Sequence, residues 1–92
     1  MRELQWSRRA LADLQRLYDF LERDSRLAAA RTVQSLARAP ERLRENPRLG
    51  EQLFQFAPRE VRRILVGRYE IRYEVQTESI IVLRLWHTRE NR

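Results

Sequence analysis

The stretch that decides the fold is "REVRRILVGRYEIRYEV", residues 59–75. Apolar residues alternate with charged ones on both sides of Gly67, and a repeat of two is the period of a β-strand. Gly67 and Arg68 supply a tight turn, so the stretch predicts a β-hairpin. In its second strand, the residues predicted to face the core are Tyr69, Ile71, Tyr73 and Val75, and those predicted to face water are Glu70, Arg72 and Glu74.

A third strand is predicted at residues 79–87, "SIIVLRLWH", after a turn in "QTES". This strand is apolar on both sides, which is typical of a central strand. The sequence does not tell which side meets the core. The two alternatives are Ile81, Leu83, Leu85 and His87, or Ile80, Val82, Arg84 and Trp86.

The N-terminal half has the spacing of helices. "RELQWS", residues 2–7, alternates over a short strand, and Ser7 can then cap a helix. Apolar residues recur every three or four positions from Arg8 to about Arg23, which predicts one helical face, with Arg9 and Asp13 paired on the outer side. A second helix is predicted after Asp24 or Ser25.

Pro40 lies in the path of the second helix, and the apolar register continues beyond it. This favours a kink or a restarted turn with Pro40 near its beginning. Residues 51–58, "EQLFQFAP", are expected to form an irregular link that Leu53, Phe54 and Phe56 pin to the core.

Together these elements predict an α+β domain with two layers. An N-terminal strand and an α-helical hairpin precede a three-stranded antiparallel meander, and the hairpin covers one face of the sheet. The 92 residues suffice for a single domain, residues 1–92.

The amino-acid composition limits the kinds of catalytic and binding site that this chain can form. The formal net charge is +6, and all nineteen basic residues are arginine, which excludes lysine nucleophiles and bases. The surplus favours an anionic partner, either nucleic acid or an acidic protein. Without cysteine and with one histidine, neither a metal nor another cofactor is expected. A charged N-terminus and the lack of a long apolar run predict no membrane partner and a cytoplasmic location.

His87 is the main candidate for a catalytic residue. Metal-independent cleavage of RNA needs a base, cations that stabilise the phosphate, and an acid. His87 or a glutamate would be the base, and arginines such as Arg72 and Arg89 would be the cations, but no residue is a convincing acid. The alternative is a histidine at a strand end that hydrogen-bonds to the backbone, and no catalytic residue is favoured.

Several segments resemble the RelE/ParE superfamily of toxins from bacterial toxin–antitoxin modules. They are "ALADLQRLYDFL" (10–21), "ERLRENPRLGEQ" (41–52), the 59–75 hairpin and "IIVLRLWHTRENR" (80–92). The resemblance implies the RelE/ParE-like fold and one of two targets. RelE-like members are ribosome-dependent endoribonucleases that cut messenger RNA, whereas ParE-like members act on DNA gyrase.

The resemblance favours the gyrase branch. Nuclease members commonly have an arginine at the position of Glu70 and an aromatic or basic residue at that of Thr88. Arg72, on the same predicted face as Glu70, is a candidate substitute for that arginine. "LWHTRENR" is similar to the ending of ParE-like proteins. A ribosome-dependent nuclease is the second hypothesis, and a non-toxic module that only binds antitoxin is the third.

The resemblance also implies a cognate antitoxin as partner, small and acidic, with which the chain would form a hetero-oligomer. Its disordered C-terminal arm would fold onto the basic surface through strand pairing or a helix in a groove. The residues predicted to bind partners are Arg59, Arg63, Glu70, Arg72, Arg84, Trp86, His87 and Arg89.

Overall fold

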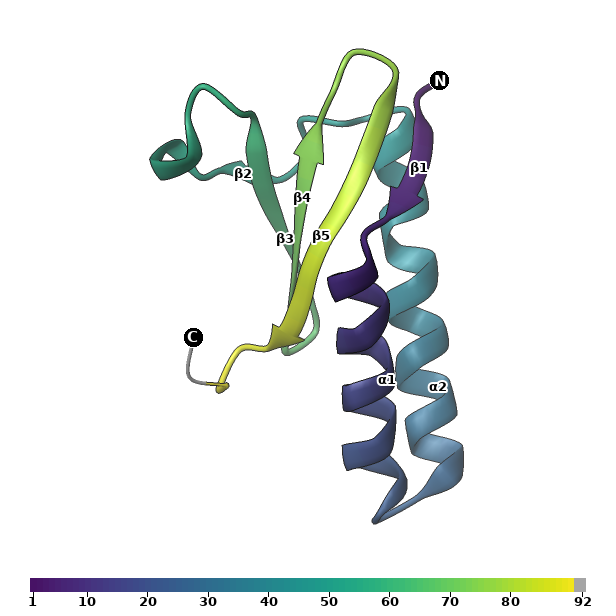
Figure 1. Ribbon diagram of the computed structural model, residues 1–92. Coiled ribbons are helices and arrows are strands. Elements are labelled where there is room, and N and C mark those ends of the chain that lie inside the picture. The colour runs from purple at the N-terminus through teal and green to yellow at the C-terminus, as the bar shows by residue number, and fades with distance from the viewer. Residues whose placement is uncertain (91–92) are drawn as a thin grey trace.

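The computed structural model describes residues 1–90, so that Asn91 and Arg92 of the C-terminal stretch lie outside the described residues. A helical hairpin covers one face of a twisted sheet, as predicted (Figure 1). The helices are α1 (Arg8–Glu22) and α2 (Arg26–Arg38), followed by the 3₁₀ helices η1 (Ala39–Arg44) and η2 (Phe54–Phe56). The strands are β1 (Glu3–Trp6), β2 (Glu51–Gln52), β3 (Val61–Val66), β4 (Tyr69–Val75) and β5 (Ser79–His87).

The sheet has five strands in the order β1-β5-β4-β3-β2. The predicted antiparallel meander of β3, β4 and β5 is confirmed. The N-terminal strand joins it as a parallel neighbour of β5, and β2 pairs antiparallel with β3. The parallel pairing depends on the α-helical hairpin, which returns the chain to the end of the sheet where it began.

The predicted helix boundaries are confirmed by their caps. Ser7 Oγ accepts a hydrogen bond from the Ala10 N–H at 3.0 Å, and Ser25 Oγ accepts one from the Ala28 N–H at 3.1 Å. These side chains satisfy donors that the first turn of a helix leaves free. Pro40 lies in the first turn of η1, where its missing N–H costs nothing.

The core lies between the helical hairpin and the sheet. Its helical side is formed by Ala10, Leu17, Leu36 and Leu43, and its sheet side by Ile64, Ile71, Tyr73, Val75, Ile80, Val82 and Leu85. The Tyr73 hydroxyl, buried in this core, accepts from the Gly50 N–H at 3.0 Å and donates to the Pro47 carbonyl at 2.8 Å. A Cβ at residue 50 would lie 2.4 Å from the Arg63 carbonyl oxygen, so only glycine permits this close approach.

The prediction for residues 51–58 was partly wrong. Glu51 and Gln52 form a short strand, and Phe54 is 72% exposed and does not reach the core. Leu53 and Phe56 are half-buried. Phe56 is turned back over the sheet by η2, and it packs on the face that the helices leave open.

A β-bulge decides which side of β5 meets the core. Tyr73 pairs with Val82 and Arg72 pairs with Arg84, so Leu83 is an extra residue between two registers. The side facing the helices is therefore occupied by Ile80 and Val82 before the bulge, and by Leu85 and His87 after it. Neither of the two predicted alternatives holds for the whole strand.

Candidate functional site

The face of the sheet opposite the helices has a stack of arginine and aromatic side chains. The guanidinium of Arg72 lies 4.8 Å from the centroid of the Trp86 ring and 5.3 Å from that of Phe56. The guanidinium of Arg84 lies 5.8 Å from the centroid of the Trp86 ring. We call Phe56, Arg72, Trp86 and Arg84 the arginine–aromatic stack. Cation–π attraction and mutual shielding explain why Trp86 is only 6% exposed on a face without helices.

Glu70 lies beside this stack, and the prediction that it faces water was wrong. Only 7% of it is exposed, because Arg63 and Arg72 cover its carboxylate with hydrogen bonds of 3.1 and 3.3 Å. Arg63 also reaches Glu51 at 2.9 Å, and the hydrogen bonds to Glu51 and Glu70 raise the pKa of Arg63. The cations of this face are thus already matched by carboxylates.

Asp13 of α1 binds Arg84 at the far end of the arginine–aromatic stack. It is 4% exposed and accepts hydrogen bonds from Arg84 Nε at 2.8 Å, from the Leu85 N–H at 2.9 Å and from Arg16 at 3.2 Å. Burial opposes ionisation of this carboxyl, but these bonds outweigh it and hold the pKa of Asp13 below its usual range. The predicted outer pair of Asp13 with Arg9 was therefore wrong.

The reason for this burial is the length of β1. That strand pairs with β5 only as far as Val82, so within residues 1–90 the outer edge of β5 beyond the bulge has no neighbouring strand. Side chains take its place: Ser7 Oγ donates to the Leu83 carbonyl at 2.8 Å, and Asp13 accepts the Leu85 N–H. Helical spacing alone does not reveal that an aspartate serves the edge of a distant strand.

His87 lies on the opposite side of the sheet from the stack. Its ring meets that of Tyr69 edge-on with centroids 5.2 Å apart, and its Nδ1 accepts the Arg89 N–H at 3.0 Å. The His87 N–H donates to Glu90 Oε1 at 2.8 Å, which closes the turn after β5. The alternative of a strand-end histidine bonded to the backbone describes this geometry, and Nε2 is the ring nitrogen that the turn leaves unused.

An apolar groove opens beside His87, between α1 and the ends of β4 and β5. Its volume is about 430 Å³, and it is lined by Arg16, Leu17, Phe20, Leu21, Tyr69, His87 and Glu90. An ion pair between Arg16 and Glu90 lies at its rim. Burial and the Glu90 carboxylate raise the pKa of Tyr69, so this phenol stays neutral and serves as part of an apolar wall.

The predicted site residues therefore separate into distinct places. Arg63, Glu70, Arg72, Arg84 and Trp86 gather on the open face, whereas His87 lies on the helix side. Arg89 is exposed in the turn that follows β5. Arg59 pairs with Glu74 at 2.6 Å, towards the other end of β4, and this contact lowers the pKa of Glu74.

This separation matters for His87, Arg72 and Arg89, the residues predicted to act together in a ribonuclease. A base and the cations that stabilise a phosphate must surround one reacting atom. Arg72 and His87 lie on opposite faces of the sheet, and Arg72 is already engaged by Glu70, Phe56 and Trp86. The trio of His87, Arg72 and Arg89 does not surround one spot.

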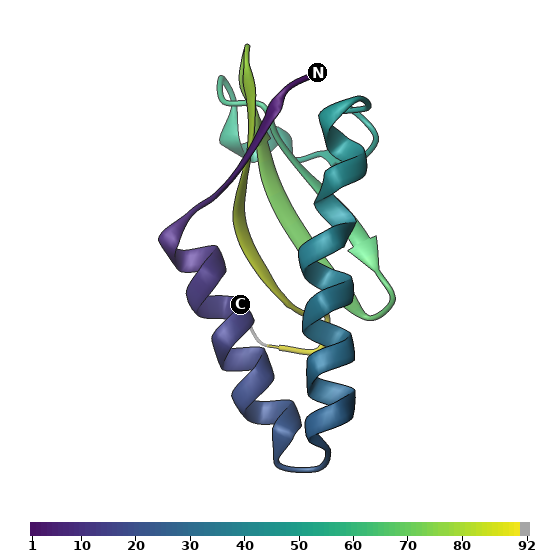
Figure 2. The same cartoon turned by 90° about the vertical axis from the view of Figure 1, so that its right-hand side faces the viewer.

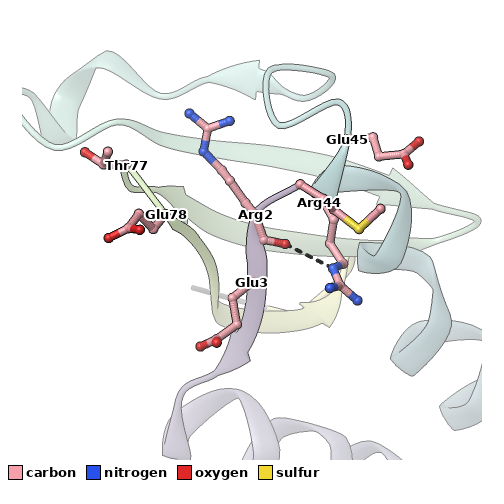
Figure 3. A pocket seen from close by; sticks show the side chains of 7 residues that line it. Arg2, Glu3, Arg44, Glu45, Thr77 and Glu78 are labelled. Atoms are coloured by element: carbon pink, nitrogen blue, oxygen red, sulfur yellow. Dashed lines mark hydrogen bonds between the residues drawn. The ribbon is translucent and has the colours of Figure 1, made fainter.

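A polar hollow lies at the opposite end of the sheet, where β1 meets the β4–β5 turn (Figure 3). Arg44 Nε donates to the Arg2 carbonyl at 3.0 Å, and Arg2 Nε donates to the Gln76 carbonyl at 2.8 Å. These contacts tie the N-terminal strand in place. Within residues 1–90, no group of three or more His, Cys, Asp or Glu side chains is placed to hold a metal ion, and no helix there is long and apolar enough to cross a membrane.

Comparison with known proteins gives a consistent result. Residues 4–92 match the family model described as "ParE toxin of type II toxin-antitoxin system, parDE". The chain is 36% identical over 87 residues to "Toxin RelE2" of Caulobacter vibrioides, and the match covers 95% of this chain and 96% of the relative. The fold is similar to a chain of the "Chromosomal ParDE TA system from P. aeruginosa", with a TM-score of 0.78, 24% identity and coverage of 95% and 96%.

Proposed function

This chain belongs to the ParE toxin family of type II toxin–antitoxin systems, and from that premise we propose that it stops growth by binding DNA gyrase. A toxin of such a system has an antitoxin as its partner. The proposal concerns the target, for which the shared fold leaves a choice between gyrase and the ribosome.

The observation that carries the proposal is the separation of His87 from Arg72 and the other arginines of the open face. Cleavage of RNA would need His87 and a phosphate-binding cation around one atom, but Arg72 is directed to the other face and its charge is matched by Glu70. A protein that acts by binding needs no such convergence. The proposal therefore treats His87, Arg89 and Trp86 as parts of contact surfaces or of their supports.

A ribosome-dependent ribonuclease is the second candidate, favoured by two observations. Nε2 of His87 is left unused by the turn that fixes the ring, and the residue lines the apolar groove. The relative with 36% identity is named "Toxin RelE2". In this case the cations would come from residues other than Arg72, or from the ribosome.

The antitoxin is proposed to be acidic, to dock through a disordered arm, and to form a hetero-oligomer with the toxin. The apolar groove beside His87 would receive an apolar side chain of that arm, and Phe20, which is 63% exposed, would extend the contact along α1. Residues Ile64–Val66 of β3 extend beyond the two-residue β2, so their outer edge could also receive a strand. Burial of the groove by the arm would add affinity that salt does not screen.

The deciding experiment adds the purified, antitoxin-free protein to DNA gyrase, ATP and plasmid. Accumulation of linear DNA that requires both proteins is the expected result. The matched control is the same toxin preparation saturated with its antitoxin, which should restore supercoiling.

Two other outcomes would overturn the proposal. Undisturbed supercoiling together with messenger RNA cut on ribosomes would establish the ribonuclease. Undisturbed supercoiling with intact messenger RNA and normal growth, by a folded protein that still binds antitoxin, would indicate a non-toxic module.

A further inference from the structure

Three arginines of α2 and η1 differ from those of the sheet in having no carboxylate partner within residues 1–90. Arg31, Arg38 and Arg42 are exposed, and within residues 1–90 none of the three forms an ion pair. We call them the α2 arginine row. Arg38 and Arg42 lie in the last turns of α2 and η1, where the helix dipole favours cations, but Arg31 lies in the middle of α2, so helix termini do not explain the whole row.

The row lies along one side of the molecule. All three arginines border one shallow hollow together with Gln34, Ser35, Ala39 and Glu41. α2 and η1 follow one another along the length of the sheet (Figure 2), and the exposure of the three side chains places the row on the outer surface of the helical layer. The rise per residue of these helices gives the row a length of roughly 16–18 Å.

The chemistry of the row fits phosphates better than a peptide. Its one carboxylate, Glu41, is paired with Arg44 at 3.2 Å, so it does not neutralise the row. Gln34 and Ser35 add uncharged donors, and Ala39 is the sole apolar residue of the hollow. A peptide that folds on binding needs apolar anchors, and those lie instead in the groove beside His87.

We propose that the α2 arginine row binds the phosphate backbone of duplex DNA without sequence preference. The phosphates of one strand advance by about 3.4 Å along the duplex axis, so the row spans roughly five of them. Arginine forks suit phosphate oxygens, and this contact releases counterions. The inference rests on the proposed function, since gyrase acts on duplex DNA, but the binding of this protein to DNA is measured without gyrase.

The test measures binding to a fluorescent 24-base-pair duplex by anisotropy over a range of salt concentrations. The variant is R31Q/R38Q/R42Q, and the matched control is R8Q/R9Q/R26Q, which removes three exposed arginines that likewise form no ion pair within residues 1–90. The row variant should bind about tenfold more weakly or worse, and its slope of log K against log salt should fall by roughly 0.9 per arginine. The control should lose much less.

Several results would overturn the inference. An equal loss in both variants would show that net charge, and not the row, drives binding, and no binding by the unaltered protein would remove the site altogether. Preferential binding of a polyglutamate peptide through the same three arginines would assign the row to an acidic protein. DNA binding through the row without gyrase-dependent linear DNA would support this inference while the proposed target fails.

Discussion

The open face of the sheet and the outer face of α2 use the same residue type in opposite ways. On the sheet, Arg63, Arg72 and Arg84 are matched by Glu70 and Asp13, and Arg72 and Arg84 also cover aromatic rings. On α2 and η1, the arginines of the row form no ion pair within residues 1–90, and Glu41, the carboxylate of their hollow, is paired with Arg44. An arginine matched by a buried carboxylate holds the fold together, whereas an unmatched one remains available to an anionic partner.

The largest expected effect comes from Trp86→Ala. This change empties the centre of the arginine–aromatic stack and should lower the free energy of unfolding by about 3–5 kcal/mol. Urea denaturation followed by circular dichroism measures it. Phe54→Ala, at a ring that is 72% exposed, is the control and should change stability by less than about 0.5 kcal/mol. Similar losses for the two variants would mean that the stack is not a structural unit.

Asp13→Asn should have the next largest effect on the free energy of unfolding. The amide cannot neutralise Arg84 and Arg16, and it offers one acceptor where the carboxylate offers two, so we expect a loss of about 2–4 kcal/mol. Asp19→Asn, at an exposed position of the same helix, should be nearly neutral. A neutral Asp13→Asn would contradict the role of this carboxylate at the edge of β5.

The stability of the unaltered protein and of Asp13→Asn can also be compared in acid. Because the folded pKa of Asp13 is lowered, its contribution is fully present above the unfolded pKa, which is near 3.9 for aspartate. That contribution is lost as the pH falls through the lower folded pKa. The stability difference between unaltered protein and Asp13→Asn should therefore be constant near neutral pH and shrink below about pH 4. A stability difference that grows in acid would mean that folding raises the pKa of Asp13 instead of lowering it.

His87→Ala should have a smaller effect, on stability and on toxicity alike. Loss of the ring contact with Tyr69 and of the bond from the Arg89 N–H should cost about 1 kcal/mol. Growth arrest and gyrase-dependent linear DNA should remain within a few fold of the unaltered protein. Complete loss of toxicity by a variant whose fold and antitoxin binding are intact would instead support catalysis by His87.

The smallest expected effect is that of R31Q/R38Q/R42Q on stability. Three exposed arginines without ion pairs should contribute less than about 0.5 kcal/mol each to folding, in contrast to the matched arginines of the sheet. Thermal unfolding of this variant beside Arg84→Gln makes the comparison direct. A larger loss for the α2 variant would mean that the row is structural and would undercut its assignment to DNA.

The fold was largely predictable, but the candidate site was not. Period-two alternation predicted β3 and β4, and Ser7 and the choice between Asp24 and Ser25 marked the two helix starts, of which the structure selects Ser25 for the second. The prediction of the site failed where the site depends on contacts between distant segments. Glu70 was expected to face water, although Arg63 and Arg72 cover it, and Asp13 was expected on the outer side, although it serves β5. Spacing within one element does not encode either contact.

The sequence by itself determined the elements, their order, the arginine-only positive surplus and the resemblance to the toxin family. These properties depend on local periodicity and composition, which neighbouring residues carry. Only the tertiary structure decided that His87 and Arg72 face apart and which arginines are matched. The bulge at Leu83 shifts the parity of β5 by one residue, and ion pairs join positions up to 74 residues apart, as between Arg16 and Glu90.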